Sequence, residues 1–367
     1  MQDSITRLDA GRHLTIHWLD NTATEFPWLW LRDHAHDPAT LHPVTQQRQL
    51  HSASIDPDIS ATAVATVDGD VVIQWPSGET SSLPVQFLAR FKSSTGATTP
   101  GHVAVLWDAT TVADLPNRVE FSDILDSDDG LQRWLAATAM YGFAIATNTP
   151  PTAEATEQLL RRIGYIRETI FGGFWEFTAD LSKADTAYTN LELLPHTDGT
   201  YSHDAPGLQL LHCLFFDGQG GESTMVDGFA IAEHIRQTRP DIHHLLSTVP
   251  IPGQYIGDGS HLMSARPVLR HDSNGALAQV SYNNADRAPF LLEANAMIDL
   301  FTALRTFDQL TNQRNRQWRH VLRPGEAMLF DNWRVLHGRT AYTGKRQLCG
   351  AYVNHEDFES RLRVLNA

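Results

Sequence analysis

The sequence predicts a mostly β protein with covering helices, in the α+β class, folded as a double-sheet jelly roll. Strand-like runs outnumber helical patterns, the two kinds of pattern follow each other in an irregular order, and the chain contains no internal repeat. A parallel α/β sheet would instead show strands and helices in regular alternation. Two antiparallel sheets packed face to face account better for this order.

Composition limits the classes of function. The chain has 367 residues, 42% hydrophobic and 19% charged, which suits one or two globular domains. Its formal net charge of −15 argues against nucleic acid as a partner, because phosphates bind to basic surfaces. The same charge suits a cationic small molecule.

The two cysteines and the N-terminus indicate the compartment. Cys213 and Cys349 lie in apolar runs and are too few for a disulfide framework, so we expect reduced core residues. Residues 1–10 show no targeting pattern, and no stretch of the sequence is long and apolar enough to span a bilayer. We therefore expect a cytoplasmic location and no membrane partner.

Residues 1–92 are predicted to form a small β domain. Leu14-Thr15-Ile16-His17-Trp18 alternates apolar and polar residues, and the runs 64–67 and 71–75 flank Asp68-Gly69, a pair suited to a hairpin turn. Four possible metal ligands lie between these runs: His34, His36, Asp37 and His42. No cysteine accompanies them and their spacing fits no standard zinc pattern, so a polar loop is the better interpretation.

A Ser/Thr/Gly/Pro-rich stretch, residues 93–104, is predicted to be a linker to a second domain at 105–367. In that domain the second helical pattern begins after Thr152, a residue placed to cap it. The predicted helices lie at 129–140, 152–170, 229–239 and 297–307. The predicted strands include 208–216, 328–330 and 347–353.

Two distant stretches carry the candidate chemistry: Leu194-Pro195-His196-Thr197-Asp198-Gly199 and Val335-Leu336-His337-Gly338-Arg339. On an extended segment, His196 and Asp198 point to the same side and can reach one metal ion. His337 would complete a set of two histidines and one carboxylate. That is the facial triad of non-haem Fe(II) oxygenases, which leaves positions open for a co-substrate and O2.

The short motif alone has little specificity. With 18 His and 43 acidic residues in the chain, about two His-x-acid triplets are expected by chance, and two are present. The second, His355-Glu356-Asp357, ends ten residues before the C-terminus and leaves no room for a distal histidine. His337 follows Asp198 by 139 positions, which is enough for most of a barrel. The alternative is that His196 and Asp198 form a surface turn pair.

Longer strings in one order along the chain are more specific. They are Ile166-Arg167-Glu168-Thr169-Ile170, Asp185-Thr186-Ala187-Tyr188-Thr189, Pro195-His196-Thr197-Asp198, Val226-Asp227-Gly228-Phe229, Tyr282-Asn283-Asn284, the run 331–339 and the run 342–350. Together they resemble the 2-oxoglutarate-dependent oxygenases of carnitine biosynthesis, the trimethyllysine and γ-butyrobetaine dioxygenase family of the taurine dioxygenase-like superfamily. The resemblance covers nearly the whole chain, and the trimethyllysine enzymes are the closer match.

The resemblance implies a small N-terminal β domain followed by a distorted double-stranded β-helix, and it implies a homodimer. Relatives often bind structural zinc in the N-terminal domain through cysteines and a histidine. Here Ala35 and Thr40 stand where zinc-binding relatives carry cysteine. We therefore predict no structural zinc.

By resemblance, His196, Asp198 and His337 bind Fe(II), and the reaction uses 2-oxoglutarate, O2 and ascorbate as reductant. The far carboxylate of 2-oxoglutarate needs a cationic partner. Arg346, nine residues after His337, suits that role by position and by the bidentate geometry of a guanidinium. Arg339 is a weaker candidate, and a surface strand position is the alternative for Arg346.

Two further residues are assigned to the co-substrate pocket. Ser223 matches a hydroxyl that assists the carboxylate in relatives. Leu211, in the strand predicted at 208–216, could line the same pocket, with a plain core position as the alternative. Arg346 and Tyr352 share one strand face and would lie about 20 Å apart, so one strand could serve both co-substrate and substrate.

A trimethylammonium group has no N–H to donate, so aromatic faces bind it. By resemblance, the cage residues are Phe171, Trp175, Tyr188 and Tyr352. The alternative is that these are core aromatics, most of all Phe171.

Asp185 matches a position that faces the other end of the substrate. An aspartate there would attract the α-ammonium of trimethyllysine and repel the carboxylate of γ-butyrobetaine, with Asn283 or Asn284 available for the α-carboxylate. The alternative is that Asp185 caps a turn.

The sequence thus predicts hydroxylation of a quaternary ammonium substrate, Nε-trimethyllysine at C3. The alternatives in the same class are γ-butyrobetaine and another such compound, for example trimethylaminoethylphosphonate. Two alternatives from other classes are a zinc hydrolase with the same three ligands and a non-catalytic reader of methylated lysine. A hydrolase would not need Arg346, and a reader would not need metal ligands.

Overall fold

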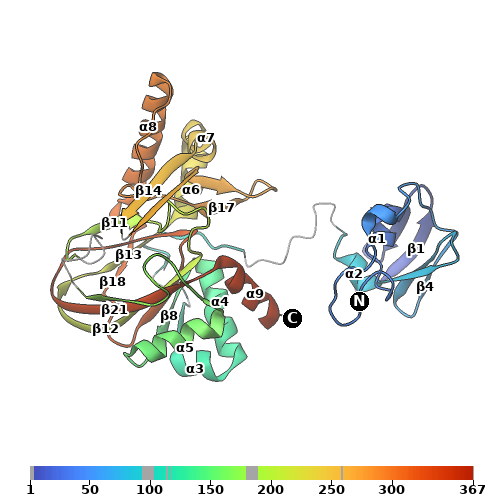
Figure 1. Ribbon diagram of the computed structural model, residues 1–367, viewed down its shortest axis with the longest axis horizontal. Helices are drawn as coiled ribbons and strands as arrows, with labels where there is room; N and C mark the ends of the chain where they lie inside the picture. The colour runs from blue at the N-terminus through green and yellow to red at the C-terminus, as the bar shows by residue number, and fades with distance from the viewer. Residues whose placement is uncertain are drawn as a thin grey trace. The chain divides into compact units, whose positions relative to one another are not determined.

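The computed structural model describes residues 4–92, 103–112, 115, 117–178, 189–257 and 259–366. The contacts divide the chain into two compact units, 1–101 and 102–367. Each unit is described by itself (Figure 1).

The first unit contains two three-stranded antiparallel sheets. One has the order β1 (Ile5–Ala10), β2 (Leu14–Trp18) and β3 (Ala23–Phe26), and the other has β4 (Ala63–Val67), β5 (Asp70–Gln74) and β6 (Thr80–Pro84). The hairpin predicted at Asp68-Gly69 is confirmed, because both residues have positive φ angles (50° and 88°) between paired β4 and β5.

A short helix, α1 (Trp28–Asp33), precedes the stretch 34–42, which was predicted as a polar loop and contains no helix or strand of the structure. Trp28 and Leu31 of α1 pack into the core of this unit. Ala35 and Thr40 are also buried, and the Thr40 hydroxyl accepts a hydrogen bond from Arg32 (2.7 Å). A second short helix, α2 (Val85–Ala89), closes the unit.

The second unit is built on two facing sheets, as the jelly-roll prediction requires (Figure 1). The larger sheet has the order β10 (Trp175–Thr178), β21 (Tyr342–Val353), β12 (Leu208–Gly220), β19 (Ala327–Asp331), β8 (Phe143–Thr147) and β7 (Arg118–Glu120), and β9 (Ile166–Arg167) also pairs with β21. The smaller sheet has the order β11 (Leu193–His196), β20 (Val335–Arg339), β13 (Ser223–Asp227) and β18 (Trp318–His320). Residues of both sheets, including Met225 and Phe330, share one buried cluster between them.

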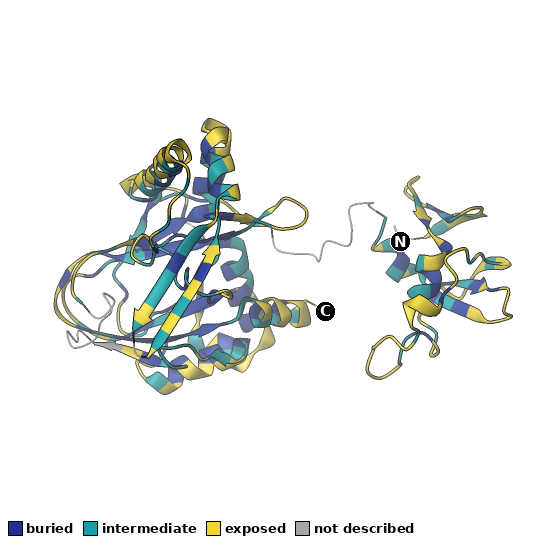
Figure 2. Cartoon of the chain, turned by 45° about the horizontal axis from the view of Figure 1, so that its top comes forward, coloured by how far each residue is buried: buried dark blue, intermediate teal, exposed yellow. Residues whose placement is uncertain are grey.

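Helices cover the outer faces of both sheets, which leaves the strands mostly buried (Figure 2). The larger sheet packs against α4 (Asp128–Tyr141), α5 (Ala153–Ile163) and α9 (His355–Leu365), with α3 (Phe121–Asp126) alongside. The smaller sheet packs against α6 (Gly228–Thr238), α7 (Pro240–Thr248) and α8 (Ala294–Thr311). Two hairpins complete the unit: β14 (Ile251–Gly257) with β15 (Ser260–Arg266), and β16 (Leu269–His271) with β17 (Leu277–Val280).

Strand β12 shows how the period of two separates core from cavity. Leu208 and Leu210 face the helices, whereas Gln209 and Leu211 line the interior between the sheets. Both cysteines are buried and free, as predicted. Among the described residues, no helix is long and apolar enough to cross a membrane.

The helix predicted over 152–170 is shorter in the structure. Thr152 caps it as predicted, accepting a hydrogen bond from the Ala155 N–H (3.2 Å), but the helix ends at Ile163. At Gly164 the chain lies so close to Asp357 of α9 that a Cβ would be 2.8 Å from the aspartate Cβ. Residues 166–167 then pair with β21, so tertiary contacts override the helical spacing of the isoleucines.

A buried ion pair joins the end of β13 to the turn between β19 and β20. Arg334 and Asp227 are 2% and 1% exposed, and the guanidinium Nε and one terminal nitrogen donate to the two carboxylate oxygens at 3.1 and 2.9 Å. Arg334 also donates to the carbonyls of Met140 and Val105 (2.9 and 2.7 Å). The pair therefore joins segments that are far apart in the sequence.

We predict that Asp227→Ala destabilises the second unit by about 3–5 kcal/mol, because it leaves the Arg334 cation buried without its carboxylate. The measurement is guanidinium denaturation followed by far-UV circular dichroism. The control is Glu233→Ala, which removes the half-buried partner of the solvent-exposed Arg236 and should change the transition by less than about 1 kcal/mol. Equal shifts for both variants would contradict the prediction.

Candidate active site

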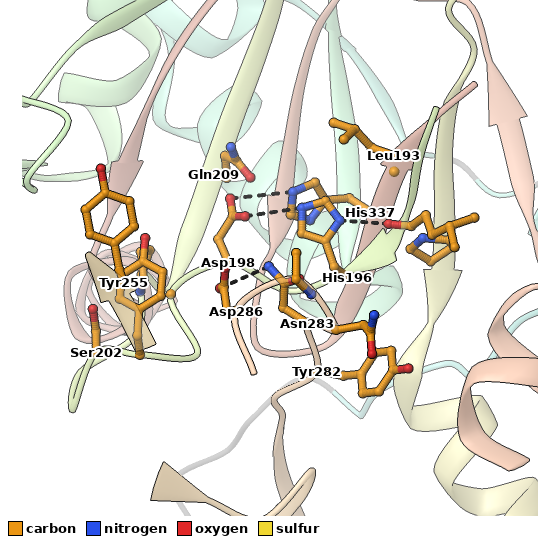
Figure 3. Close-up of a pocket in the computed structure, with 18 of the residues that line it drawn as sticks. Leu193, His196, Asp198, Ser202, Gln209, Tyr255, Tyr282, Asn283, Asp286 and His337 are labelled. Carbon is orange, nitrogen blue, oxygen red and sulfur yellow. Dashed lines mark hydrogen bonds and ion pairs between the residues drawn. The ribbon is translucent and has the colours of Figure 1, made fainter. Parts of the chain in front are cut away.

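A cavity of about 960 Å³ opens between the two sheets of the second unit. Side chains of β10, β12, β13, β20 and β21 line it, together with the loops that follow β11 and β17. Figure 3 shows the predicted metal ligands in this cavity, pointing toward one another.

The two histidines are brought together by strand pairing. His196 ends β11 and lies directly opposite His337 of β20 in the antiparallel register. Their ring centroids are 4.5 Å apart. The two histidines are 141 positions apart in the sequence, and the pairing of two neighbouring strands brings them together.

The Asp198 carboxylate faces both imidazoles. Its two oxygens lie 3.4 Å from Nε2 of His196 and 3.5 Å from Nε2 of His337. Asn332 fixes its backbone, because the Asn332 amide accepts from the Asp198 N–H (2.7 Å) and donates to the Asp198 carbonyl (3.1 Å). The chain turns at Gly199, where φ is +72° and a Cβ would meet Pro206 at 2.6 Å.

The protonation states suit metal binding. Burial would raise the pKa of Asp198, but the two histidines outweigh it and hold this pKa well below its usual value. Burial lowers the pKa of His337. Burial also acts to lower the pKa of His196, but the hydrogen bond and charge of Asp198 outweigh it and raise this pKa. A metal ion would displace the proton from His196.

The three side chains fit a divalent ion. Their ligand atoms lie within 4.8 Å of one another, and they are the one such group among the described residues. Cis ligands about 2.1 Å from an ion stand about 3 Å apart, so small movements would complete the site. Nδ1 of His196 is 2.8 Å from the Leu194 carbonyl and donates to it, which leaves Nε2 for the metal. Two imidazoles and one carboxylate suit Fe(II).

Arg346 lines the same cavity and is only 8% exposed. Burial, and then the charge of Arg339, lower its pKa to about 10, so it is a cation at neutral pH. No carboxylate among the described residues forms an ion pair with it. Because a buried cation without a counter-ion is costly, this position suits an anionic ligand.

The other residues assigned to the co-substrate pocket lie nearby. Ser223 and Leu211 both line the cavity. Arg339, the weaker candidate, donates to the carbonyls of Thr189 and Leu191 (2.7 and 2.8 Å), which suits a structural role.

The described aromatic candidates fall into two groups. Trp175 and Tyr352 pack edge to face, with centroids 5.7 Å apart, and both line the cavity. The Trp175 ring lies over Gly350, where a Cβ would be 2.7 Å from the indole, so only glycine permits this approach. Phe171 packs instead against Tyr255 (5.5 Å), which contacts Tyr201 (5.3 Å).

Tyr352 also contacts the metal ligands. Its hydroxyl donates to Oδ2 of Asp198 at 2.8 Å, a contact that the sequence did not predict. The ring therefore connects the predicted cage to the predicted metal site.

The remaining predicted residues are only partly described. Asp185 and Tyr188 lie outside the described residues. Asn283 braces its own loop: its amide donates to Asp286 (3.0 Å) and accepts from the Ala285 N–H (2.9 Å). Asn284 lines the cavity.

Three cavity or supporting residues were not found from the sequence: Asn332, Gln209 and Asp286. Gln209 is 4% exposed, and its side-chain oxygen has no hydrogen-bond partner in the described part of the chain. Asn332 lies in one of the strings that carry the family resemblance, but nothing in its residue type indicates the clamp on Asp198. Strand alternation would have placed Gln209 inside once Leu208 and Leu210 were assigned to the core.

Comparisons with known proteins found similar proteins over most of the chain. The model of the taurine catabolism dioxygenase TauD, TfdA family matches residues 109–352, and the gamma-butyrobetaine hydroxylase-like N-terminal model matches residues 5–88. The mitochondrial trimethyllysine dioxygenase of Gallus gallus is 39% identical over 97% of this chain and 86% of its own length. The trimethyllysine dioxygenase of Meyerozyma guilliermondii is 34% identical over 97% and 94%. The gamma-butyrobetaine dioxygenase of Pseudomonas sp. strain AK-1 is 32% identical over 96% and 93%.

We predict that Tyr352→Phe weakens divalent metal binding about 10-fold, because it removes a donor to Asp198 and keeps the ring. The measurement is calorimetric titration of the metal-free protein with Mn(II). Tyr282→Phe is the matched control, since the Tyr282 hydroxyl donates to Asp308 and not to a metal ligand. The prediction is wrong if the two variants bind Mn(II) equally well.

Proposed function

Because this chain belongs to the TauD, TfdA family of dioxygenases, we propose that it hydroxylates Nε-trimethyllysine at C3 with Fe(II), 2-oxoglutarate and O2. The observation that supports this most is that the largely enclosed triad of His196, Asp198 and His337 shares one cavity with aromatic faces and with a guanidinium that has no carboxylate partner among the described residues. The relatives named trimethyllysine dioxygenase support the choice of substrate.

His196, Asp198 and His337 would hold the iron, with Tyr352 and Asn332 fixing the carboxylate ligand. Bound Fe(II) supplies the activation of O2 that couples decarboxylation of 2-oxoglutarate to oxidation of a C–H bond. The three side chains all line the cavity, so an ion held by them would be accessible from it.

Arg346 would bind the far carboxylate of 2-oxoglutarate, with Ser223 beside it. The guanidinium offers two parallel N–H donors to a carboxylate, and the pairing offsets the cost of its burial. Because Arg346 and Tyr352 lie six residues apart on β21, about 20 Å along the strand, the co-substrate and the substrate approach the metal site from different ends.

Trp175 and Tyr352, with Phe171 and Tyr188 as further predicted members, would bind the trimethylammonium group. Each aromatic face contributes about 0.5–2 kcal/mol to a cation, depending on how far water is excluded. The substrate nitrogen lies four bonds from C3, about 5 Å. Tyr352 belongs to the cage, and its hydroxyl donates a hydrogen bond to Asp198. A trimethylammonium group bound by this cage can therefore place C3 beside the metal site.

The overall reaction balances as one trimethyllysine, one O2 and one 2-oxoglutarate giving hydroxytrimethyllysine, succinate and CO2. The protein's part is positioning, since the choice of carbon depends on which C–H bond lies nearest the metal.

The family resemblance also supports three finer proposals: ascorbate as reductant, a homodimer and a role in carnitine biosynthesis. A cytoplasmic location is a separate proposal that the resemblance does not support, since the Gallus gallus relative is named mitochondrial. Family membership and the buried Arg346 argue against the zinc hydrolase and the methyl-lysine reader. γ-Butyrobetaine remains the second candidate substrate, because a dioxygenase named for it is also similar to this chain.

The test is succinate formation and product mass with Fe(II), ascorbate and 2-oxoglutarate across trimethyllysine, γ-butyrobetaine and trimethylaminoethylphosphonate. We expect trimethyllysine to give the highest kcat/KM and a product with one added oxygen at C3. Turnover that does not rise above the substrate-free rate with trimethyllysine, or that is higher with another compound, overturns the proposal.

We further predict that Arg346→Lys raises the KM for 2-oxoglutarate about 10- to 100-fold, because lysine keeps the charge but loses the bidentate geometry. The KM for trimethyllysine should change little. The neighbouring variant Arg339→Lys is the control. If the 2-oxoglutarate KM rises more in Arg339→Lys than in Arg346→Lys, the prediction is wrong and Arg339 is the residue that binds the carboxylate.

A further inference from the structure

A second carboxylate, that of Asp286, lies in the cavity beside the metal ligands. Asp286 belongs to the loop 282–287 that follows β17 and lines the cavity. Figure 3 labels it on the same side of the cavity as Asp198. Family resemblance gave no role to this residue.

The backbone of this loop is attached to the metal-binding segment. Thr197, the residue between His196 and Asp198, donates its N–H to the Tyr282 carbonyl (2.8 Å). Tyr282 in turn donates its N–H to the Thr197 hydroxyl (2.9 Å). The position of the loop is therefore fixed relative to the metal ligands.

The side chain of Asp286 is also held in place. Its Oδ2 accepts hydrogen bonds from the Thr200 hydroxyl (3.1 Å) and from the Asn283 amide (3.0 Å). Its backbone carbonyl accepts from the Gln254 N–H of β14 (2.7 Å). These contacts orient the carboxylate in the cavity. Such a carboxylate is ordered before a ligand arrives, which lowers the entropic cost of binding.

The charge of Asp286 acts on His196, one of the proposed metal ligands. It contributes to the raised pKa of His196, after the larger effects of burial, Asp198 and the Leu194 carbonyl. The aromatic pair Trp175 and Tyr352 belongs to the larger sheet, whereas Asp286 is carried by the loop bonded to the metal-binding segment.

The dimensions of trimethyllysine match this arrangement. Its α-nitrogen lies two bonds from C3, about 2.5 Å, whereas its trimethylammonium nitrogen lies about 5 Å from C3. If the cage holds the far cation and C3 lies at the metal site, the α-ammonium must also lie close to the metal ligands. A carboxylate fixed beside those ligands is the partner that an ammonium group needs.

We infer that Asp286 binds the α-ammonium group of the substrate and so selects an amino acid over a betaine. This inference rests on the proposed function. γ-Butyrobetaine places a carboxylate at that end of the molecule, and Asp286 would repel it. The α-ammonium would instead form a charge-assisted hydrogen bond that a substrate without the amino group cannot make.

The experiment compares trimethyllysine with its des-amino analogue, 6-(trimethylammonio)hexanoate, using the full chain with Fe(II), 2-oxoglutarate and ascorbate. For Asp286→Asn we expect kcat/KM for trimethyllysine to fall about 10- to 100-fold. The value for the des-amino analogue should change by less than about 3-fold or should rise. Anaerobic dissociation constants for the two compounds should follow the same pattern.

Two control variants separate specificity from loop damage. Asp308→Asn removes another cavity carboxylate, one that accepts from the Tyr282 hydroxyl, and should alter both substrates by the same factor. Thr200→Val removes one donor to Asp286 but keeps its charge, so the preference for trimethyllysine should persist. In each variant, a dissociation constant for 2-oxoglutarate within about 2-fold of the wild-type value would indicate that the site is intact.

A fall of equal size for both compounds in Asp286→Asn would overturn the inference, since it would indicate a structural role. An unchanged trimethyllysine kcat/KM in that variant would overturn it as well. Failure of the proposed function looks different, because the wild-type protein would then not hydroxylate trimethyllysine at all.

Discussion

The pairing of β11 with β20 is the constraint on which the rest of the site depends. It sets His196 opposite His337, and Asp198, two residues after His196, turns one carboxylate oxygen toward each ring. The support comes from elements far away in the sequence: Asn332 clamps the backbone of Asp198, and the Tyr352 hydroxyl holds its carboxylate. The metal ligands are therefore ordered by the same packing that closes the two sheets around a shared core.

In the proposed function, strand β21 links the metal site to both ligands. Its inward face carries Arg346 near one end and Tyr352 near the other, and Gly350 leaves room for the Trp175 ring between them. The guanidinium at one end is suited to a dicarboxylate, and the aromatic faces at the other end are suited to a cation without N–H groups. A single strand thus separates the two ligands by charge as well as by distance.

The sequence predicted what depends on local periodicity and on short motifs. The Asp68-Gly69 hairpin and the Thr152 cap follow from backbone preferences, and the jelly-roll class follows from the order of strands and helices. The spacing of His196 and Asp198, with the family resemblance, was enough to suggest the metal ligands. The assigned roles of Asp185 and Tyr188 remain predictions, because both residues lie outside the described part of the chain.

What the sequence could not supply are contacts between distant segments. Ile166 continues a helical spacing, but its pairing with Val353 makes it part of a strand. In the sequence, nothing distinguishes Asp286 from the other acidic residues, of which the chain has 43 in all. In the structure, the hydrogen bonds between Thr197 and Tyr282 bring its loop beside the metal ligands. The Tyr352 hydroxyl reaches Asp198 across 154 positions, a distance over which residue type alone carries no information.

The most direct test of the metal site is anaerobic absorption spectroscopy of the protein with Fe(II) and 2-oxoglutarate. Chelation of 2-oxoglutarate to protein-bound Fe(II) gives a visible charge-transfer band, and the account predicts that this band forms with the wild-type chain and is lost in His196→Ala and in His337→Ala. A wild-type protein that shows no such band, or a band of full intensity in both variants, would contradict a site in which these three side chains converge on one ferrous ion.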